Sequence, residues 1–162
     1  ICPFLHGSGS RGRDALMRAG MGLALLRPWG PALWRRYSAS LWPGLAGAEA
    51  RAARLTALLR RPGRWRAFRA TTRADHRVVK PWFETLACPA LVVMGEEDPD
   101  WKDPAAEAAW VAAAVGRSAE PAPILMVPGA GHAPMLEHSG AVGPRIVDFA
   151  RSVSAPADDN RG

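Results

Sequence analysis

The chain has 162 residues, of which 48% are hydrophobic, so it is long and apolar enough to form one domain with a core. Two cysteines are too few for a disulfide framework or a cysteine-rich zinc site, and we expect both to be free, buried thiols in a reducing cytoplasm. The formal net charge is +6. The sequence shows no apolar stretch long enough to span a membrane and no charged-then-apolar signal segment.

Residues 1–12 open the chain with an apolar run, Ile1–Leu5, followed by glycines and serines. We predict the end of a core strand and then a loop. His6-Gly7 could instead belong to a loop whose backbone amides bind an oxyanion. That alternative would require further strands and a turn carrying a nucleophile between this loop and Asp98, the acidic residue after the later apolar run Ala90–Met94. The sequence offers neither. The run around Ser8 and Ser10 lacks the final glycine of a Gly-x-Ser-x-Gly elbow, so we treat both serines as loop residues. Because the chain starts inside an apolar run, we expect it to be the C-terminal piece of a longer protein.

Residues 13–83 are rich in alanine, leucine and arginine and are interrupted by proline and glycine. The pattern predicts helices over Asp14–Leu26, with Asp14 as N-cap, and over Pro31–Leu41, Ala48–Leu59 and Trp65 to Arg69 or beyond. Most lysines and arginines precede Trp82, whereas most acidic residues follow it. Arginine-rich helices with tryptophans raise nucleic acid or an anionic membrane as alternative partners. No nucleic-acid-binding motif is present, so we expect solvated arginine faces and no nucleic-acid partner.

Residues 84–154 contain two apolar runs that each break at a glycine. Ala90–Met94 leads to Asp98, and Ile124–Val127 leads to His132. Such runs are typical of strands buried on both faces of a parallel sheet, and their carboxyl ends meet at one edge. Helices are predicted over 104–115, with Asp103 as N-cap and Gly116 at the end, and over 142–153. Residues 155–162 read as a disordered tail.

An acidic residue after one strand and a histidine after a later one follow the order of a nucleophile–His–acid triad in which the nucleophile comes first. Asp98 lies among other acidic residues, so a solvated acidic loop is the plain alternative, and Asp100 is the fallback acid. We expect Asp98 and His132 to lie within hydrogen-bonding reach on adjacent loops. His138 is expected to face solvent, and His76 has no recognisable partner. The spacing predicts no metal site and no cofactor.

Two turns carry a resemblance to a known family. Gly95-Glu96-Glu97-Asp98 and Pro128-Gly129-Ala130-Gly131-His132-Ala133-Pro134 resemble the acid and histidine turns of α/β-hydrolases, and Glu137 and the Cys88-Pro89 entry also fit. From about Leu86 to Ala150 the chain therefore resembles the C-terminal part of that fold. The resemblance implies an α/β class with a partial α/β-hydrolase fold, a helical cap or lid over 13–83, and a C-terminal core half over 84–154. Pro3-Phe4 is similar to the end of the strand after the nucleophile helix.

The resemblance also implies a function. His132 would be the general base and Asp98 its orienting acid, in an esterase-like enzyme acting on an apolar small-molecule ester. The nucleophile and oxyanion donors would lie before residue 1, so this chain alone would be inactive. Relatives with an Asp nucleophile, such as dehalogenases and epoxide hydrolases, stay open, as does a non-catalytic binding protein. The aromatic residues of the helical region would line an acyl pocket or simply pack against the core: Trp29, Trp34, Trp42, Trp65 and Phe68.

Overall fold

The computed structural model describes residues 11–74, 76–83, 85–116 and 120–154. The predicted strand Ile1–Leu5, the loop serines Ser8 and Ser10, and the tail 155–162 lie outside the described residues.

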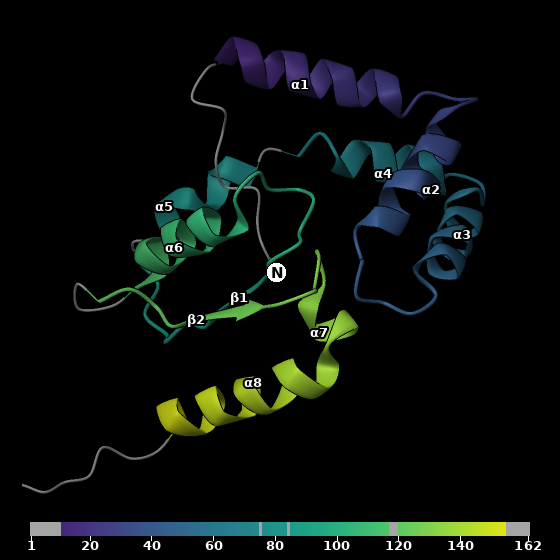
Figure 1. The fold of residues 1–162 in the computed structure, drawn as a ribbon. Coiled ribbons are helices and arrows are strands. Elements are labelled where there is room, and N and C mark those ends of the chain that lie inside the picture. Colours follow the sequence, from purple (N-terminus) through teal and green to yellow (C-terminus); the bar gives the residue numbers. More distant parts are fainter. Residues whose placement is uncertain (1–10, 75, 84, 117–119, 155–162) are drawn as a thin grey trace, which may run out of the picture.

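The described chain has an α/β fold with a small parallel sheet (Figure 1). Strand β1 (Val92–Gly95) pairs with β2 (Ile124–Val127) so that Val92 lies opposite Ile124 and Gly95 lies opposite Val127. Helix α6 (Pro104–Val115) connects them, as the two apolar runs and the alanine-rich segment between them predicted. Its N-cap is confirmed, because the Asp103 carboxylate accepts a hydrogen bond of 2.9 Å from the Ala106 N–H.

Helices cover both faces of the sheet. Residues of β1 pointing one way, Val92 and Met94, pack against α6, whereas Val93 packs on the opposite side in a cluster with Val142 of α8 (Ser139–Ser154). Helix α8 begins three residues earlier than predicted. Burial on both faces was predicted for both strands and is wrong for the start of β2, where Ile124 is 40% exposed. The buried contact of α8 is made by Val142, near its N-terminus, and this covers the Val127 end of β2.

The N-terminal helices precede β1 in the chain (Figure 1). They are α1 (Arg11–Ala24), α2 (Gly30–Ser40), α3 (Ala48–Leu59) and α4 (Arg64–Thr71), followed by a 3₁₀ turn at His76–Val79 and α5 (Lys80–Phe83). The predicted helix positions are confirmed with shifts of a few residues at their ends. The N-cap prediction for Asp14 is wrong, because α1 already includes Arg11, a good helix former.

The aromatic side chains of the N-terminal helices pack in two different ways. Trp42 and Trp65 are buried, and the indole Nε1 of Trp65 donates a 3.1 Å hydrogen bond to the carbonyl of Leu25, which fixes the end of α1 to α4. These two rings therefore pack the helices together rather than line a pocket. Trp34 and Phe68 instead lie side by side with ring centroids 4.5 Å apart, across α2 and α4.

The prediction of buried cysteines is wrong for Cys88, which is free and exposed. It lies in the irregular segment between α5 and β1, outside the layers that form the core. Cys2 is outside the described residues.

The N-terminal helices meet the sheet where the α2–α3 loop (residues 41–47) contacts the segment after β2. A side chain at Gly131 would place its Cβ 2.3 Å from the Leu41 carbonyl oxygen and 2.5 Å from Pro43 Cδ. Both contacts are far below van der Waals distance, so only glycine fits here without a shift of backbone.

We therefore expect Gly131→Ala to destabilise the protein by about 1–3 kcal/mol, the usual cost of overpacking. The measurement is urea unfolding followed by circular dichroism. Gly140→Ala is the matched control, because nothing lies within 4 Å of a Cβ built at that position in α8. Alanine there is expected to be neutral or slightly stabilising. Equal stability of Gly131→Ala and the control would show that the two segments do not meet as described.

Candidate functional site

The site forms where two turns meet at the carboxyl edge of the sheet. The acid turn (residues 96–101) follows β1, and the histidine loop (residues 128–133) follows β2. The N–H of Glu96 donates to the Val127 carbonyl at 3.1 Å, and the N–H of Glu97 donates to the Ala130 carbonyl at 2.9 Å. A Cβ at Gly95 would lie 2.1 Å from the Gly131 carbonyl oxygen, so glycine at the end of β1 is what lets the turns approach.

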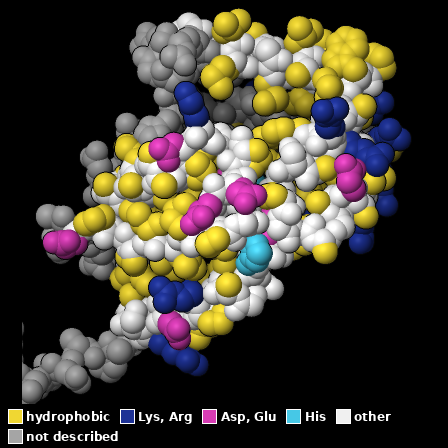
Figure 2. All heavy atoms as spheres, in the orientation of Figure 1, with side chains coloured by type: hydrophobic (Ala, Val, Ile, Leu, Met, Phe, Trp, Pro, Cys, Tyr) yellow, Lys and Arg dark blue, Asp and Glu magenta, His cyan; other side chains and the backbone are white. Residues whose placement is uncertain are grey.

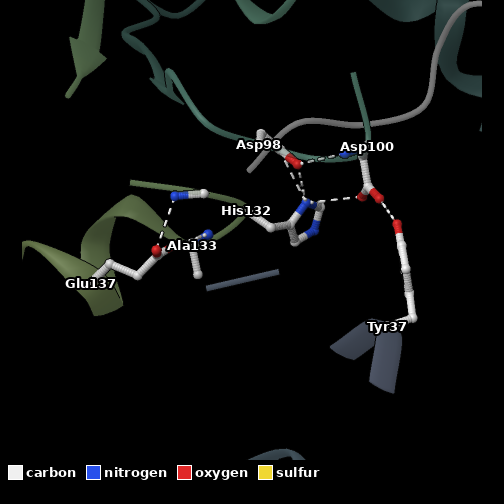
Figure 3. Close-up of polar contacts among 7 residues, drawn as sticks. Tyr37, Asp98, Asp100, His132, Ala133 and Glu137 are labelled. Atoms are coloured by element: carbon white, nitrogen blue, oxygen red, sulfur yellow. Dashed lines mark hydrogen bonds and ion pairs between the residues drawn. The ribbon is translucent and has the colours of Figure 1, made fainter. Parts of the chain in front are cut away.

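Asp98 and His132 face each other across this contact (Figure 3). Nδ1 of His132 lies 3.2 Å from Oδ2 and 3.4 Å from Oδ1 of Asp98. Asp98 is only 3% exposed, whereas the His132 side chain is 33% exposed. The expectation that these two residues lie on adjacent loops within hydrogen-bonding reach is confirmed. Their catalytic role stays a prediction.

A second carboxylate reaches the same nitrogen. Oδ2 of Asp100 lies 3.0 Å from His132 Nδ1, and the N–H of Asp100 donates a 3.0 Å hydrogen bond to Oδ1 of Asp98. The Tyr37 hydroxyl of α2 donates to Oδ1 of Asp100, as Figure 3 shows. The fallback acid therefore does not replace Asp98 but joins it. Tyr37 was not predicted from the sequence, because it lies 63 positions before Asp100 in a helix that shows no catalytic pattern.

The two carboxylates change the chemistry of the imidazole. Hydrogen bonds that the His132 ring donates to Asp100 and, with a smaller effect, to Asp98 raise its pKa from 6.5 to about 10, against an opposing effect of burial. Near neutral pH the ring is therefore an imidazolium in this arrangement. It becomes a base as the pH rises toward its pKa or when one carboxylate contact is weakened.

The backbone of the histidine loop is fixed from two sides. The His132 N–H donates to the Leu41 carbonyl at 2.8 Å. The Glu137 carboxylate, at the end of α7 (Pro134–Glu137), accepts from the N–H groups of Gly131 at 2.9 Å, Ala133 at 3.0 Å and Gly44 at 3.0 Å. Glu137 thus ties the residues on either side of His132 to the α2–α3 loop.

Replacing Glu137 by glutamine is expected to destabilise the protein by about 2–3 kcal/mol, because hydrogen bonds to a charged acceptor contribute most and an amide NH₂ would face N–H donors. Urea unfolding at neutral pH measures this change. Glu96→Gln is the control, since Glu96 is an exposed carboxylate of the acid turn. A loss no larger than that of the control would mean that Glu137 does not hold the loop.

The prediction that His138 faces solvent is wrong. Its Nε2 is buried and has no hydrogen-bond partner among the described residues, and a Cβ built on Gly44 would lie 2.6 Å from it. The α2–α3 loop covers this ring, a contact between distant parts of the chain. The side chain of His76 lies outside the described residues.

Asp98, Asp100 and His132 are also the donor types that bind a divalent cation. One donor atom from each lies within 4.8 Å of the others. The same oxygen and nitrogen atoms are joined by the hydrogen bonds above, so a cation would have to displace the proton on Nδ1.

Comparison with protein-family models, with curated proteins and with solved structures finds no match to this chain. Within the described ranges, none of the helices combines the length and the apolar character needed to cross a membrane.

Proposed function

We propose that Asp98 and His132 are the acid and the base of a nucleophile–His–acid triad in an esterase-like α/β-hydrolase. In this proposal the N-terminal helices form a cap over the C-terminal half of the fold. The observation that supports it best is the buried Asp98 carboxylate on Nδ1 of a partly exposed histidine, with both residues following parallel strands at one sheet edge.

The two ring nitrogens of His132 would have different tasks. Nδ1 is held by carboxylates, whereas Nε2 has no hydrogen-bond partner among the described residues. When the ring is neutral, at a pH near or above its raised pKa or with one carboxylate contact weakened, Nε2 is the atom that would accept a proton from the nucleophile and return it to the leaving group. Asp98 would remain ionised, fix the tautomer and stabilise the imidazolium.

A triad also needs a nucleophile and oxyanion donors. The 162 residues contain no Gly-x-Ser-x-Gly sequence, so in this proposal the nucleophile precedes Ile1. A serine there would give ester hydrolysis, whereas an aspartate would give the chemistry of dehalogenases or epoxide hydrolases.

The test is hydrolysis of p-nitrophenyl butyrate by a polypeptide that extends the chain upstream of Ile1 in its own reading frame. We expect turnover by the extended protein, its loss in His132→Ala, and no turnover above a histidine-containing control by residues 1–162 alone. Activity that survives His132→Ala would overturn the proposal. An extended protein without any hydrolase activity would favour a non-catalytic binding protein.

A further inference from the structure

A second candidate site lies in the N-terminal helices. A groove of about 440 Å³ runs between α2, α3 and α4, within the size range of small-molecule sites (~300–1,000 Å³). Its apolar lining consists of Trp34 of α2, Phe68 of α4 and three leucines of α3, namely Leu55, Leu58 and Leu59. None of the residues that contact His132 lines it, so it is distinct from the acid–histidine site.

The groove is bordered by positive charge. Arg61, after the end of α3, and Arg64, at the start of α4, line it and are exposed. Among the described residues neither guanidinium has a carboxylate within ion-pairing distance; the pair between Arg35 and Glu49 at 3.7 Å lies elsewhere on α2 and α3. Residues 11–74 contain fourteen arginines and two acidic residues, and Figure 2 shows the basic side chains gathered over α2, α3 and α4.

An apolar floor with two free guanidiniums matches one kind of ligand. A chain of methylenes gains from burial against leucine and aromatic surface, and a carboxylate matches the planar donor fork of arginine. We propose that this groove binds a single-chain alkyl carboxylate, with its chain against Trp34 and Phe68 and its carboxylate paired to Arg61 and Arg64. The inference does not depend on the proposed function, since it involves neither Asp98 nor His132.

The experiment is isothermal titration of the 162-residue chain with decanoate below its micelle concentration, and with 1-decanol as the uncharged probe of equal length. We expect saturable binding of one decanoate per chain and at least tenfold weaker binding of 1-decanol. The double variant Arg61→Gln/Arg64→Gln should weaken decanoate binding about tenfold or more and leave 1-decanol unchanged.

The matched control is Arg60→Gln/Arg66→Gln, which removes the same charge from neighbouring exposed positions that do not line the groove. It should leave decanoate affinity within about twofold. Equal weakening by both double variants would overturn the proposal and assign the basic surface to non-specific anion attraction. The proposal is equally overturned by equal affinity for the two probes, by the absence of saturable binding, or by binding to phosphatidylserine vesicles without binding to decanoate monomers.

Discussion

Asp98→Asn is expected to reduce kcat/KM for p-nitrophenyl butyrate by about ten-thousand-fold in the upstream-extended protein, the loss typical of removing the charge behind a catalytic histidine. The buried Asp98 faces Nδ1. An amide there can turn its NH₂ toward the ring and favour the tautomer that carries its proton on Nε2, which cannot accept the proton of a nucleophile.

Asp100→Asn is expected to behave differently. This carboxylate is the first cause of the raised pKa of His132, so its removal lowers that pKa and moves the alkaline rise of kcat/KM to lower pH. The maximal rate should change far less than in Asp98→Asn. Asp148→Asn, an exposed carboxylate of α8, is the control and should follow the unmodified protein. The reverse ranking of the two variants would make Asp100 the acid.

The stability of the chain is expected to fall as the pH rises from about 6.5 to 10. The folded pKa of His132 is raised above its unfolded value, so the folded state binds more protons in this window. The stabilising contribution is fully present below pH 6.5 and is lost as the pH passes the folded pKa. The slope from this one group is at most about 1.4 kcal/mol per pH unit.

His132→Gln isolates this effect, because other groups also titrate in the same range. The variant removes the titrating ring. The free energy of unfolding should therefore depend less steeply on pH in the variant, even if the substitution also changes the free energy of unfolding at every pH. Urea unfolding at several pH values between 6 and 10 gives the two slopes. Identical slopes for the two proteins would show that the carboxylates do not hold a proton on His132.

Local signals explain which parts of the fold were predictable. Asp103 and Pro104 mark the start of α6, and Gly95 marks the end of β1, because capping oxygens, a fixed proline φ and the absence of a Cβ act within a few residues. The approach of Asp98 to His132 followed from one further rule, that the carboxyl ends of parallel strands share an edge.

Long-range contacts explain what was not predictable. Tyr37 contacts Asp100 of the acid turn across 63 positions, and Gly44 contacts Glu137 across 93 positions. Leu41 accepts a hydrogen bond from the His132 N–H. No local sequence pattern marks these three residues. The burial of His138 Nε2 depends on the same α2–α3 loop. Glu137 lies close to His132 in the sequence, but its position there does not predict the three backbone amides from which its carboxylate accepts.

Titration of His132 by NMR, with ¹⁵N-labelled histidine in the 162-residue chain, measures the acid–histidine contact itself. His132→Gln assigns the signal among the four histidines. The structure predicts a pKa of about 10, which falls in Asp98→Asn and in Asp100→Asn and is unchanged in Asp148→Asn. A His132 that titrates near 6.5, with no response to Asp98→Asn, would contradict the pairing on which the proposed function rests.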